Sequence, residues 1–278
     1  MKQSAFQFFI QPKIRKRMAD CFLLALLMIC ISLPLDNAAQ AQNLDEWQSP
    51  TYILKAFNEI ALKNEYRSTA QRILKWQQPI YYRFQYHDLP QNTMVENLFS
   101  IHLKHLAEIT KHNIQPSGKH KANLLIHITR DRHYNQVIRQ FTSSNVSNIA
   151  RESHCMGSFK THSDAISEAQ IVLPVDHLFS KGLLVSCIVE ETTQVMGLPN
   201  DSDWVNPSIA NDVSKIELLT GLDYLFLTIL YDRQIKAGMS RKRSQPIIKA
   251  IITQLQQQGI IDNAQHLVNK GGLNAYLE

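Results

Sequence analysis

The chain has 278 residues, of which 44% are hydrophobic and 19% charged, and its formal net charge is +5. This length allows one large domain or two small ones with a buried core, and the ordinary hydrophobic share excludes a disordered or collagen-like chain. Four cysteines are too few for a small fold built on disulfides, and the positive charge invites a nucleic-acid interpretation that depends on where the charges lie.

Residues 1–41 have the pattern of a signal peptide, in which basic residues precede an apolar run over 21–35 and Ala39-Gln-Ala41 is a small-x-small cleavage site. The run is about fifteen residues, shorter than the roughly 20 that span a bilayer as a helix, so we expect cleavage near Gln42; a retained anchor is the alternative. We therefore expect an exported protein, periplasmic or secreted, without a stable membrane span. Residues 42–278 keep only +2 of the charge, so no nucleic-acid partner is expected.

Hydrophobic periodicity predicts one α+β domain over 73–240, in which a small mixed sheet packs on long helices, between a helical flank at 42–72 and a helical tail at 241–278. The expected order is a strand at 79–86, an amphipathic helix at 93–112, a break at 114–118, a strand at 123–129, a polar loop at 141–163, a strand at 169–174, and helices at 182–196, 218–231 and 247–255.

Without the leader, the cysteines of the chain are Cys155 and Cys187. Two cysteines in an oxidising compartment predict one disulfide, which would contribute about 3–4 kcal/mol to the free energy of unfolding on the chain-entropy model. A reactive thiol is the other interpretation, but no Cys-His-Asn pattern or Cys-x-x-Cys motif supports it.

The segment 187–201 has the spacing of a metal-binding helix, in which two His flank a catalytic Glu and are followed by Gly and a third ligand. Glu190 and Gln194, four residues apart on one helix face, occupy the positions of the two His. Asn200 or Asp201 occupies the position of the third ligand, after the turn at Gly197. Glu191, at the general-base position, is the residue of the expected type.

This frame resembles that of the metzincin peptidases, and 219–231 resembles their closing helix. The chain is also similar to the bacterial family called domain of unknown function 2927, with coverage from about Trp76 to Met239. The similarity lies in Cys-x-x-Glu-Glu-x-x-Gln at 187–194, Gly-Leu-Pro-Asn-Asp at 197–201, Ser-Ile-Ala-Asn-Asp at 208–212, Leu-Tyr-Asp at 230–232 and Gly-Met at 238–239. Ala210 stands where a Phe is expected. The resemblance implies that 73–240 is a zincin-like domain, and it supplies no established activity.

The donor set does not favour a metal or another cofactor. Zinc prefers His nitrogen, Cys sulfur and carboxylate oxygen, and the neutral amide of Gln194 is a poor substitute. An all-oxygen site for Ca²⁺ or Mg²⁺ usually gathers more carboxylates than are aligned here. We expect Glu190 and Gln194 to form hydrogen bonds that hold the helix to the following loop, with zinc or a hard divalent cation as the alternative.

The eleven histidines form no His-x-x-x-His motif. His102 and His127 lie in apolar segments, where a core role is more common than a ligand role. His154, His162 or His177 could reach the helix at 182–196 from loops. The basic cluster at 241–243 is interpreted as a solvated surface, with contact to an anionic membrane or cell-wall polymer as the alternative.

Two functions from different classes follow. The first is a non-catalytic protein with a degenerate metzincin-like domain and a binding or structural role in the cell envelope, where its partner would be an unknown protein or an envelope component. The second is a peptidase-like hydrolase, with or without metal, that uses Glu191 as a general base. The second requires Glu191 to line an accessible cleft in which further polar groups converge.

Overall fold

The computed structural model describes residues 46–63, 71–142 and 153–277. The predicted leader, 1–41, lies outside the described residues. From Trp47 onward the chain forms a compact unit of its own. Within the described part of the chain, no helix is both long enough and apolar enough to cross a membrane.

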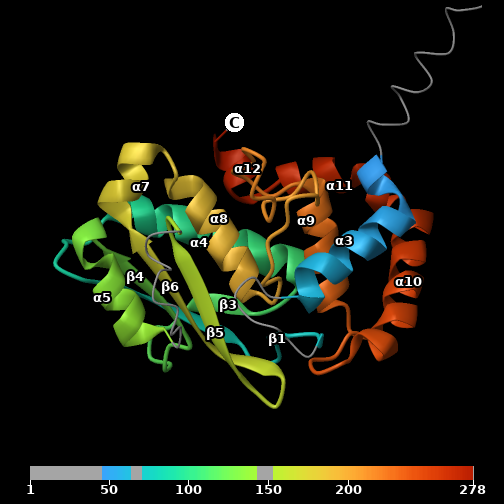
Figure 1. Ribbon diagram of the computed structural model, residues 1–278, viewed down its shortest axis with the longest axis horizontal. Helices are drawn as coiled ribbons and strands as arrows, with labels where there is room; N and C mark the ends of the chain where they lie inside the picture. Colours follow the sequence, from blue (N-terminus) through green and yellow to red (C-terminus); the bar gives the residue numbers. More distant parts are fainter. Residues whose placement is uncertain (1–45, 64–70, 143–152, 278) are drawn as a thin grey trace, which may run out of the picture. The chain divides into compact units, whose positions relative to one another are not determined.

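The centre of this unit is a mixed sheet (Figure 1). Its strands are β1 (Lys75–Trp76), β2 (Ile80–Tyr86), β3 (Ile114–Pro116), β4 (Leu124–Thr129), β5 (Met156–His162) and β6 (Ala165–Pro174). The pairing order is β1-β6-β4-β2-β3 with all pairs parallel, and β5 pairs antiparallel with β6 at the edge, where Ser158 lies opposite Gln170.

Helices cover both faces of the sheet and extend beyond it (Figure 1). They are η1 (Glu46–Gln48), α3 (Pro50–Leu62), α4 (Thr93–Thr110), α5 (Asp131–Phe141), α7 (Val175–Lys181), α8 (Leu184–Val195), α9 (Gly221–Tyr231), α10 (Arg241–Gln257), α11 (Ile260–Asn269) and α12 (Gly272–Leu277). Alternation along β6 divides the core, because Ile171 and Leu173 join the main cluster while Val172 packs with residues of α5. Helices α4 and α8 therefore lie on one face, and α5 lies on the other.

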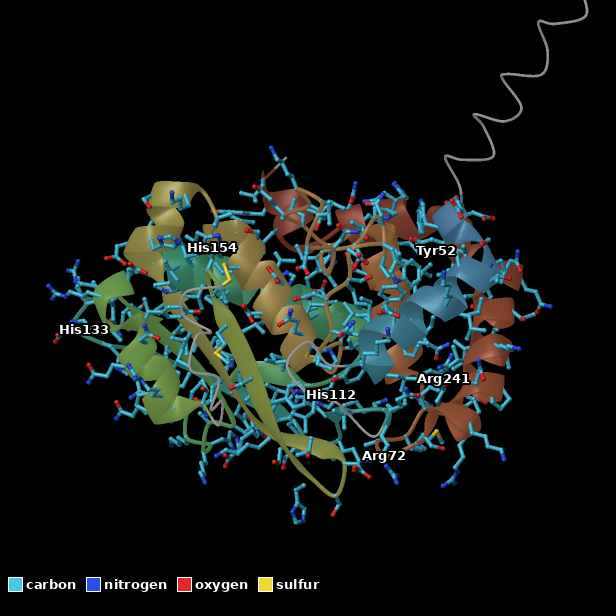
Figure 2. All side chains as sticks on the ribbon, viewed as in Figure 1. Tyr52, Arg72, His112, His133, His154 and Arg241 are labelled. Carbon is cyan, nitrogen blue, oxygen red and sulfur yellow. A yellow bond between two sulfur atoms is a disulfide. The ribbon has the colours of Figure 1, made fainter. Side chains whose placement is uncertain are left out.

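Local signals explain where the main helices begin. Asn92 caps α4, because its side chain accepts hydrogen bonds from the backbone N–H groups of Met94 and Val95. Thr220 and Asp223 form a reciprocal capping box at the start of α9. The amphipathic pattern of 93–112 then places Leu98, Phe99, Leu103 and Leu106 in the core. Figure 2 shows the side chains on this framework.

Several expected boundaries are wrong. The segment 141–163, expected to be a polar loop, contains β5, and the last long helix begins at Arg241 rather than after Pro246. The break expected at 114–118 is confirmed, since α4 ends at Thr110, but the segment also contains the short strand β3. The pattern of β5 was missed because its outer half is exposed and polar, as befits an edge strand. Helices α5 and α7 were not expected at all. The architecture is nevertheless the predicted one in outline, a mixed sheet with packed helices.

Candidate functional site

The helix α8 carries the residues singled out by the sequence. It buries Cys187, Ile188 and Val189 in the core and leaves Glu190 and Gln194 partly exposed. Glu191 is only 4% exposed, although it carries a carboxyl group. The helix ends before Gly197, which has φ +113 and approaches the backbone so closely that a Cβ would lie 2.0 Å from the Leu74 carbonyl oxygen. Glycine is therefore required at this turn.

The loop after α8 folds back onto the helix. The Gln194 side-chain amide donates a hydrogen bond to Asp201 Oδ1 at 2.9 Å, so Asp201 returns to the helix face. The buried Asn200 points elsewhere, because its side-chain amide donates to the backbone carbonyl of Asp201. Of the two residues considered for the third ligand position, the fold thus brings Asp201 to Gln194.

A buried aspartate fixes the rest of this loop against α9. Asp223 accepts hydrogen bonds from the Ser208 hydroxyl at 2.6 Å, from the Ile209 backbone N–H at 3.0 Å and from Thr220. Burial raises the pKa of Asp223, while these hydrogen bonds act in the opposite direction. Asn211 completes the loop by donating to the Val205 carbonyl and accepting from two backbone N–H groups. The loop wall is therefore held by internal hydrogen bonds.

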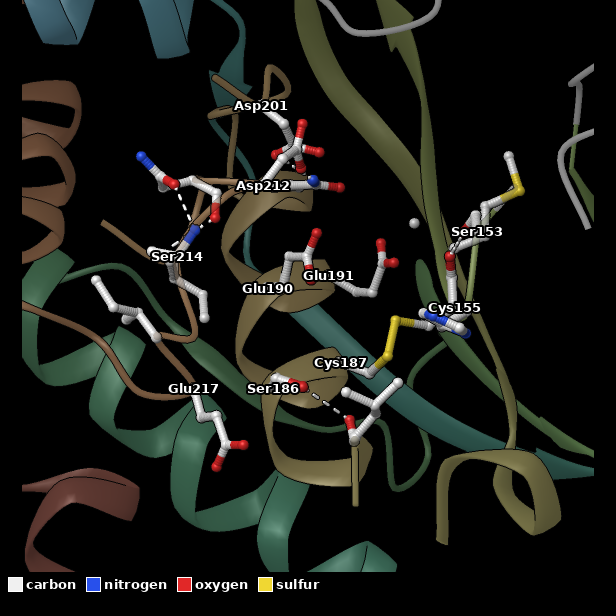
Figure 3. Close-up of a pocket in the computed structure, with 18 of the residues that line it drawn as sticks. Ser153, Cys155, Ser186, Cys187, Glu190, Glu191, Asp201, Asp212, Ser214 and Glu217 are labelled. Carbon is white, nitrogen blue, oxygen red and sulfur yellow. Dashed lines mark hydrogen bonds between the residues drawn. A yellow bond between two sulfur atoms is a disulfide. The ribbon is translucent and has the colours of Figure 1, made fainter. Parts of the chain in front are cut away.

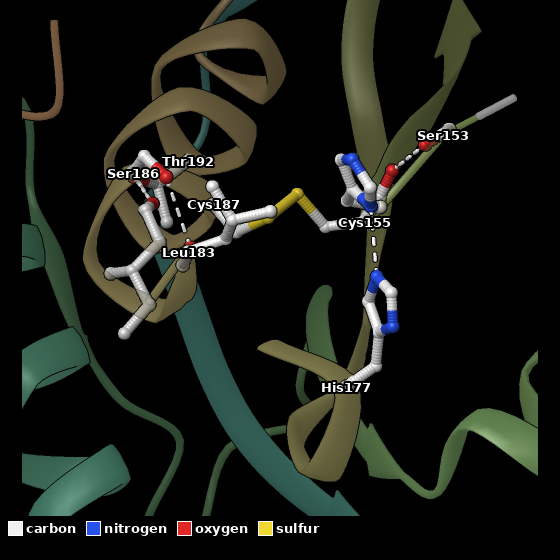
Figure 4. Close-up of a disulfide and its surroundings, with 9 residues drawn as sticks. Ser153, Cys155, His177, Leu183, Ser186, Cys187 and Thr192 are labelled. Atoms are coloured by element: carbon white, nitrogen blue, oxygen red, sulfur yellow. Dashed lines mark hydrogen bonds between the residues drawn. A yellow bond between two sulfur atoms is a disulfide. The ribbon is translucent and has the colours of Figure 1, made fainter. Parts of the chain in front are cut away.

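The edge strand β5 forms the opposite wall, and the residue just before it is bonded covalently to α8. Cys155 and Cys187 form the predicted disulfide, with a Cα–Cα distance of 6.0 Å (Figure 4). Two residues further along the chain, Gly157 lies against the Glu191 carboxylate, and a Cβ at this position would be 2.6 Å from Glu191 Oε2. The absence of a side chain at Gly157 allows the strand to approach the helix.

A cavity of about 500 Å³ lies between α8, the start of β5 and the loop after α8 (Figure 3). Among the described residues that line it, five carry carboxylates and one carries an ammonium group: Glu190, Glu191, Asp201, Asp212 and Glu217, against Lys215. Apolar side chains such as Ile209 and Ile216 share the lining. The described lining is thus predominantly acidic with apolar portions, which suits a positively charged organic group.

Two neighbouring groups respond to this environment. Although Asp212 is exposed as a residue, partial burial of its carboxyl raises the pKa of that group, and the nearby Asp203 carboxylate raises it further. Tyr134, buried on α5, has its pKa raised by burial and in addition by the negative charge of Glu191, against an opposing effect of Ser153. The Tyr134 phenol therefore stays neutral near Glu191.

The histidines lie in three different settings relative to this cavity. His154 lines the cavity, and its Nδ1 lies 2.8 Å from Nε2 of His177 on α7 (Figure 4). His162 lies at the far end of β5. His102 is fully buried in α4, and His127 is buried on β4, where it bonds Gln170 at 2.7 Å and His87 at 2.9 Å.

The donor groups at the ligand positions do not fit zinc. Within the described residues, no three or more His, Cys, Asp or Glu side chains are placed to hold one metal ion. Gln194, at one His position, is hydrogen-bonded to Asp201, and Glu190 supplies an oxygen where an imidazole would be required.

The comparisons with known proteins are consistent with the motifs in this region. The family model described as "Protein of unknown function (DUF2927)" matches residues 50–250. The chain belongs to this family. No curated protein and no solved structure matches the chain. Three of the motifs on which the resemblance to DUF2927 rests lie together in the fold, because 187–194 is in α8 and both 197–201 and 208–212 are in the loop that folds back onto α8.

Some residues of the site were missed from the sequence. Gly157 and Tyr134 lie in segments that were not recognised as elements, so nothing indicated their position near Glu191. The motif at 208–212 does not indicate that Asp212 lines a cavity, and none of the motifs includes Glu217. The proximity of Ser208 to Asp223 depends on the path of a long loop, although the pattern Ser-Ile-Ala-Asn-Asp is itself a turn signal.

Proposed function

We propose that this DUF2927 protein is exported to the cell envelope and that its cavity binds a cationic ligand without cleaving it. We also propose that its domain is a degenerate metzincin-like one. This proposal is supported by the order β2, α4, β4, β6, α8 and α9, which follows the order of elements predicted from the sequence. The structure adds the antiparallel edge strand β5 beside α8. The disulfide supports export, since such bonds persist in oxidising compartments.

The observation that carries the non-catalytic proposal is the hydrogen bond from Gln194 to Asp201. These residues stand at two of the positions where the resemblance places zinc ligands, and here they bind each other. The carboxylates of the described lining favour a positively charged ligand, because Coulomb attraction stabilises a cationic group that enters the cavity. The apolar lining would contact the body of the ligand.

The test is calorimetric titration of the oxidised protein with trilysine, and with triglutamate and trialanine for comparison. We expect trilysine to bind and the other two peptides to bind at least tenfold more weakly. Glu190→Gln should weaken trilysine binding about tenfold, since hydrogen bonds to charged groups contribute roughly 1.5–3 kcal/mol. Glu108→Gln, which removes an exposed carboxylate from α4, is the matched control and should have no effect. Equal binding of the three peptides would contradict the proposal.

One observation favours a second function, that of a hydrolase with Glu191 as general base. This function is supported by the position of Glu191, which is only 4% exposed but lines the cavity together with Glu190, Gln194 and Asp201. The test is turnover of a mixed peptide library followed by mass spectrometry, with metal content measured on the same sample. Cleavage that Glu191→Gln abolishes while Glu108→Gln retains it would replace the binding proposal. Intact peptides after prolonged incubation would support binding alone.

A further inference from the structure

A second charged region lies away from the cavity, at the beginning of α10. Residues 233–261 contain six Lys or Arg and no Asp or Glu, although 42–278 as a whole carries only +2. With Arg72 these cations define the basic end of the unit: Arg72, Arg233, Lys236, Arg241, Lys242, Arg243 and Lys249, all of which are exposed. The remainder of 42–278 is therefore net acidic.

The fold brings the separate parts of the basic end together. Arg72 pairs with Ser240 in an isolated antiparallel bridge, and the Arg241 backbone N–H donates to the Gln71 carbonyl at 3.2 Å. The Arg72 guanidinium donates to the Gly238 carbonyl at 3.0 Å and lies 3.7 Å from Asp164, at the border of the region. Figure 2 shows Arg72 and Arg241 on the same side of the unit, away from His154 at the cavity.

The stability of α10 does not explain this cluster. Arg241, Lys242 and Arg243 occupy the first turn, where the positive end of the helix dipole disfavours cations. No carboxylate of the described residues forms an ion pair with any of the three. The arrangement costs electrostatic energy in the isolated protein, and an anionic partner would remove that cost.

The geometry favours an extended partner over a single small anion. Consecutive residues of a helix point about 100° apart, so the side chains of Arg241, Lys242 and Arg243 diverge and do not converge on one phosphate. A charged bilayer surface accommodates diverging, flexible cations without a shaped site, and clusters of about four to eight Lys or Arg are typical of proteins that bind one. We propose that the basic end docks on phosphate headgroups of an anionic membrane, with the cavity left accessible.

The experiment is a flotation assay with the protein purified in the form that cells produce. It is mixed with vesicles of phosphatidylcholine containing 30% phosphatidylglycerol and, separately, with pure phosphatidylcholine vesicles. The neutral vesicles report apolar insertion of the leader. The basic residues of the leader also attract anionic lipid, but substitutions in α10 leave that contribution unchanged. We expect binding to the anionic vesicles to exceed binding to neutral ones and to be lost in high salt, which screens exposed charges. Arg241→Gln/Lys242→Gln/Arg243→Gln should weaken this binding about a hundredfold, since each cation near an anionic surface contributes about fivefold.

The matched control is Arg132→Gln/Arg139→Gln/Lys181→Gln, which removes three exposed cations from α5 and α7, on the other side of the unit. It should change vesicle binding less than threefold. A second variant, Arg233→Gln/Lys236→Gln, tests the turn before α10 and should weaken binding about 25-fold. Equal losses in the two triple variants, equal binding to neutral vesicles, or binding to soluble heparin without binding to vesicles would each overturn the proposal. Thermal unfolding by circular dichroism verifies that each variant is folded.

Discussion

Gly157 determines how near β5 lies to the Glu191 carboxylate. An alanine Cβ at this position would be 2.6 Å from Glu191 Oε2 and 3.1 Å from Val195 Cγ1, so either the strand or the glutamate must move. We expect Gly157→Ala to lower the free energy of unfolding by about 1–3 kcal/mol, as overpacking usually does. Urea unfolding of the oxidised protein measures this change.

The control for this prediction is the double variant Gly157→Ala/Glu191→Ala. Removing the carboxylate removes the shorter of the two side-chain clashes. Gly157→Ala should therefore lower the free energy of unfolding less in the Glu191→Ala background than in the natural protein. The difference between the two losses is the coupling energy of the pair. If both backgrounds show the same loss, the Gly157 contact with Glu191 does not limit the approach of β5.

At the scale of single residues, the sequence predicts those parts of the site that local spacing controls. Glu190 and Gln194 share a face because they are four residues apart in a helix. The pairing of Cys155 with Cys187 could be predicted by counting, since the chain without its leader has no other cysteine. Gly157 and Tyr134 could not be predicted in this way. Their position near Glu191 is set by how β5 and α5 pack on the sheet, which local spacing does not encode.

At the scale of elements, the disulfide joins β5 to α8 across a sequence separation of 32 residues. Its removal in Cys155→Ala/Cys187→Ala should lower the free energy of unfolding by about 3–4 kcal/mol, because the unfolded chain regains the entropy of the open loop. Urea unfolding with and without reductant measures this difference. The double variant is its own control, since reductant should destabilise the natural protein and leave the variant unchanged.

The same bond has a chemical signature. Cys155 and Cys187 are joined in a disulfide and are buried, at 6% and 3% exposure, so neither residue should react with a thiol reagent until the protein is reduced. Rapid labelling before reduction would mean that the two thiols are free in the natural protein, and the stability difference expected above would then disappear.

Element prediction succeeded where one face of a segment is strongly apolar. The segment 93–112 became α4 with little change, because its apolar stripe faces the core. The edge strand β5 and the three-residue strand β3 lack such a stripe, and β3 is in addition closed by Pro116. Pro246 was treated as a helix start, whereas α10 tolerates it in the second turn. Edge position and tertiary packing decided these three cases.

At the scale of the whole unit, the hydrophobic core, the acidic residues of the cavity and the basic residues of α10 occupy different regions. The main core joins the sheet to α3, α4, α8 and α9, the acidic lining lies at the cavity, and the basic end lies at α10. The mixed sheet with packed helices could be predicted from the order of the elements. The separation of charge could not, since it requires knowing that Arg72 lies beside residues 238–241.

Buried histidines make the stability of this unit depend on pH. Burial lowers the pKa of His102 to about 3 and that of His127 to about 4, in both cases with a smaller contribution from a neighbouring histidine. Burial also lowers the pKa values of His87, His105 and His112. In the unfolded chain these groups bind protons below their ordinary value of about 6.5, whereas in the folded protein they stay neutral to lower pH.

The sign of the effect follows from this difference. The unfolded state binds more protons than the folded state between pH 6.5 and 4, so acid favours unfolding and the stability present above pH 6.5 is lost as the pH falls. The raised pKa values of Asp223 and Asp212 act in the opposite direction, for two groups against five among the described residues. We expect the free energy of unfolding to fall by about 1.4 kcal/mol per pH unit for each histidine that stays neutral only when folded.

Urea unfolding between pH 7 and 4 tests this expectation with the oxidised protein. His102→Leu removes the buried imidazole whose pKa is lowered to about 3, so its free energy of unfolding should fall less steeply with acid than that of the natural protein. His162→Gln, on the exposed end of β5, is the matched control and should keep the natural slope. If His102→Leu and His162→Gln show the same slope as the natural protein, the burial of His102 does not contribute to the acid sensitivity of the fold.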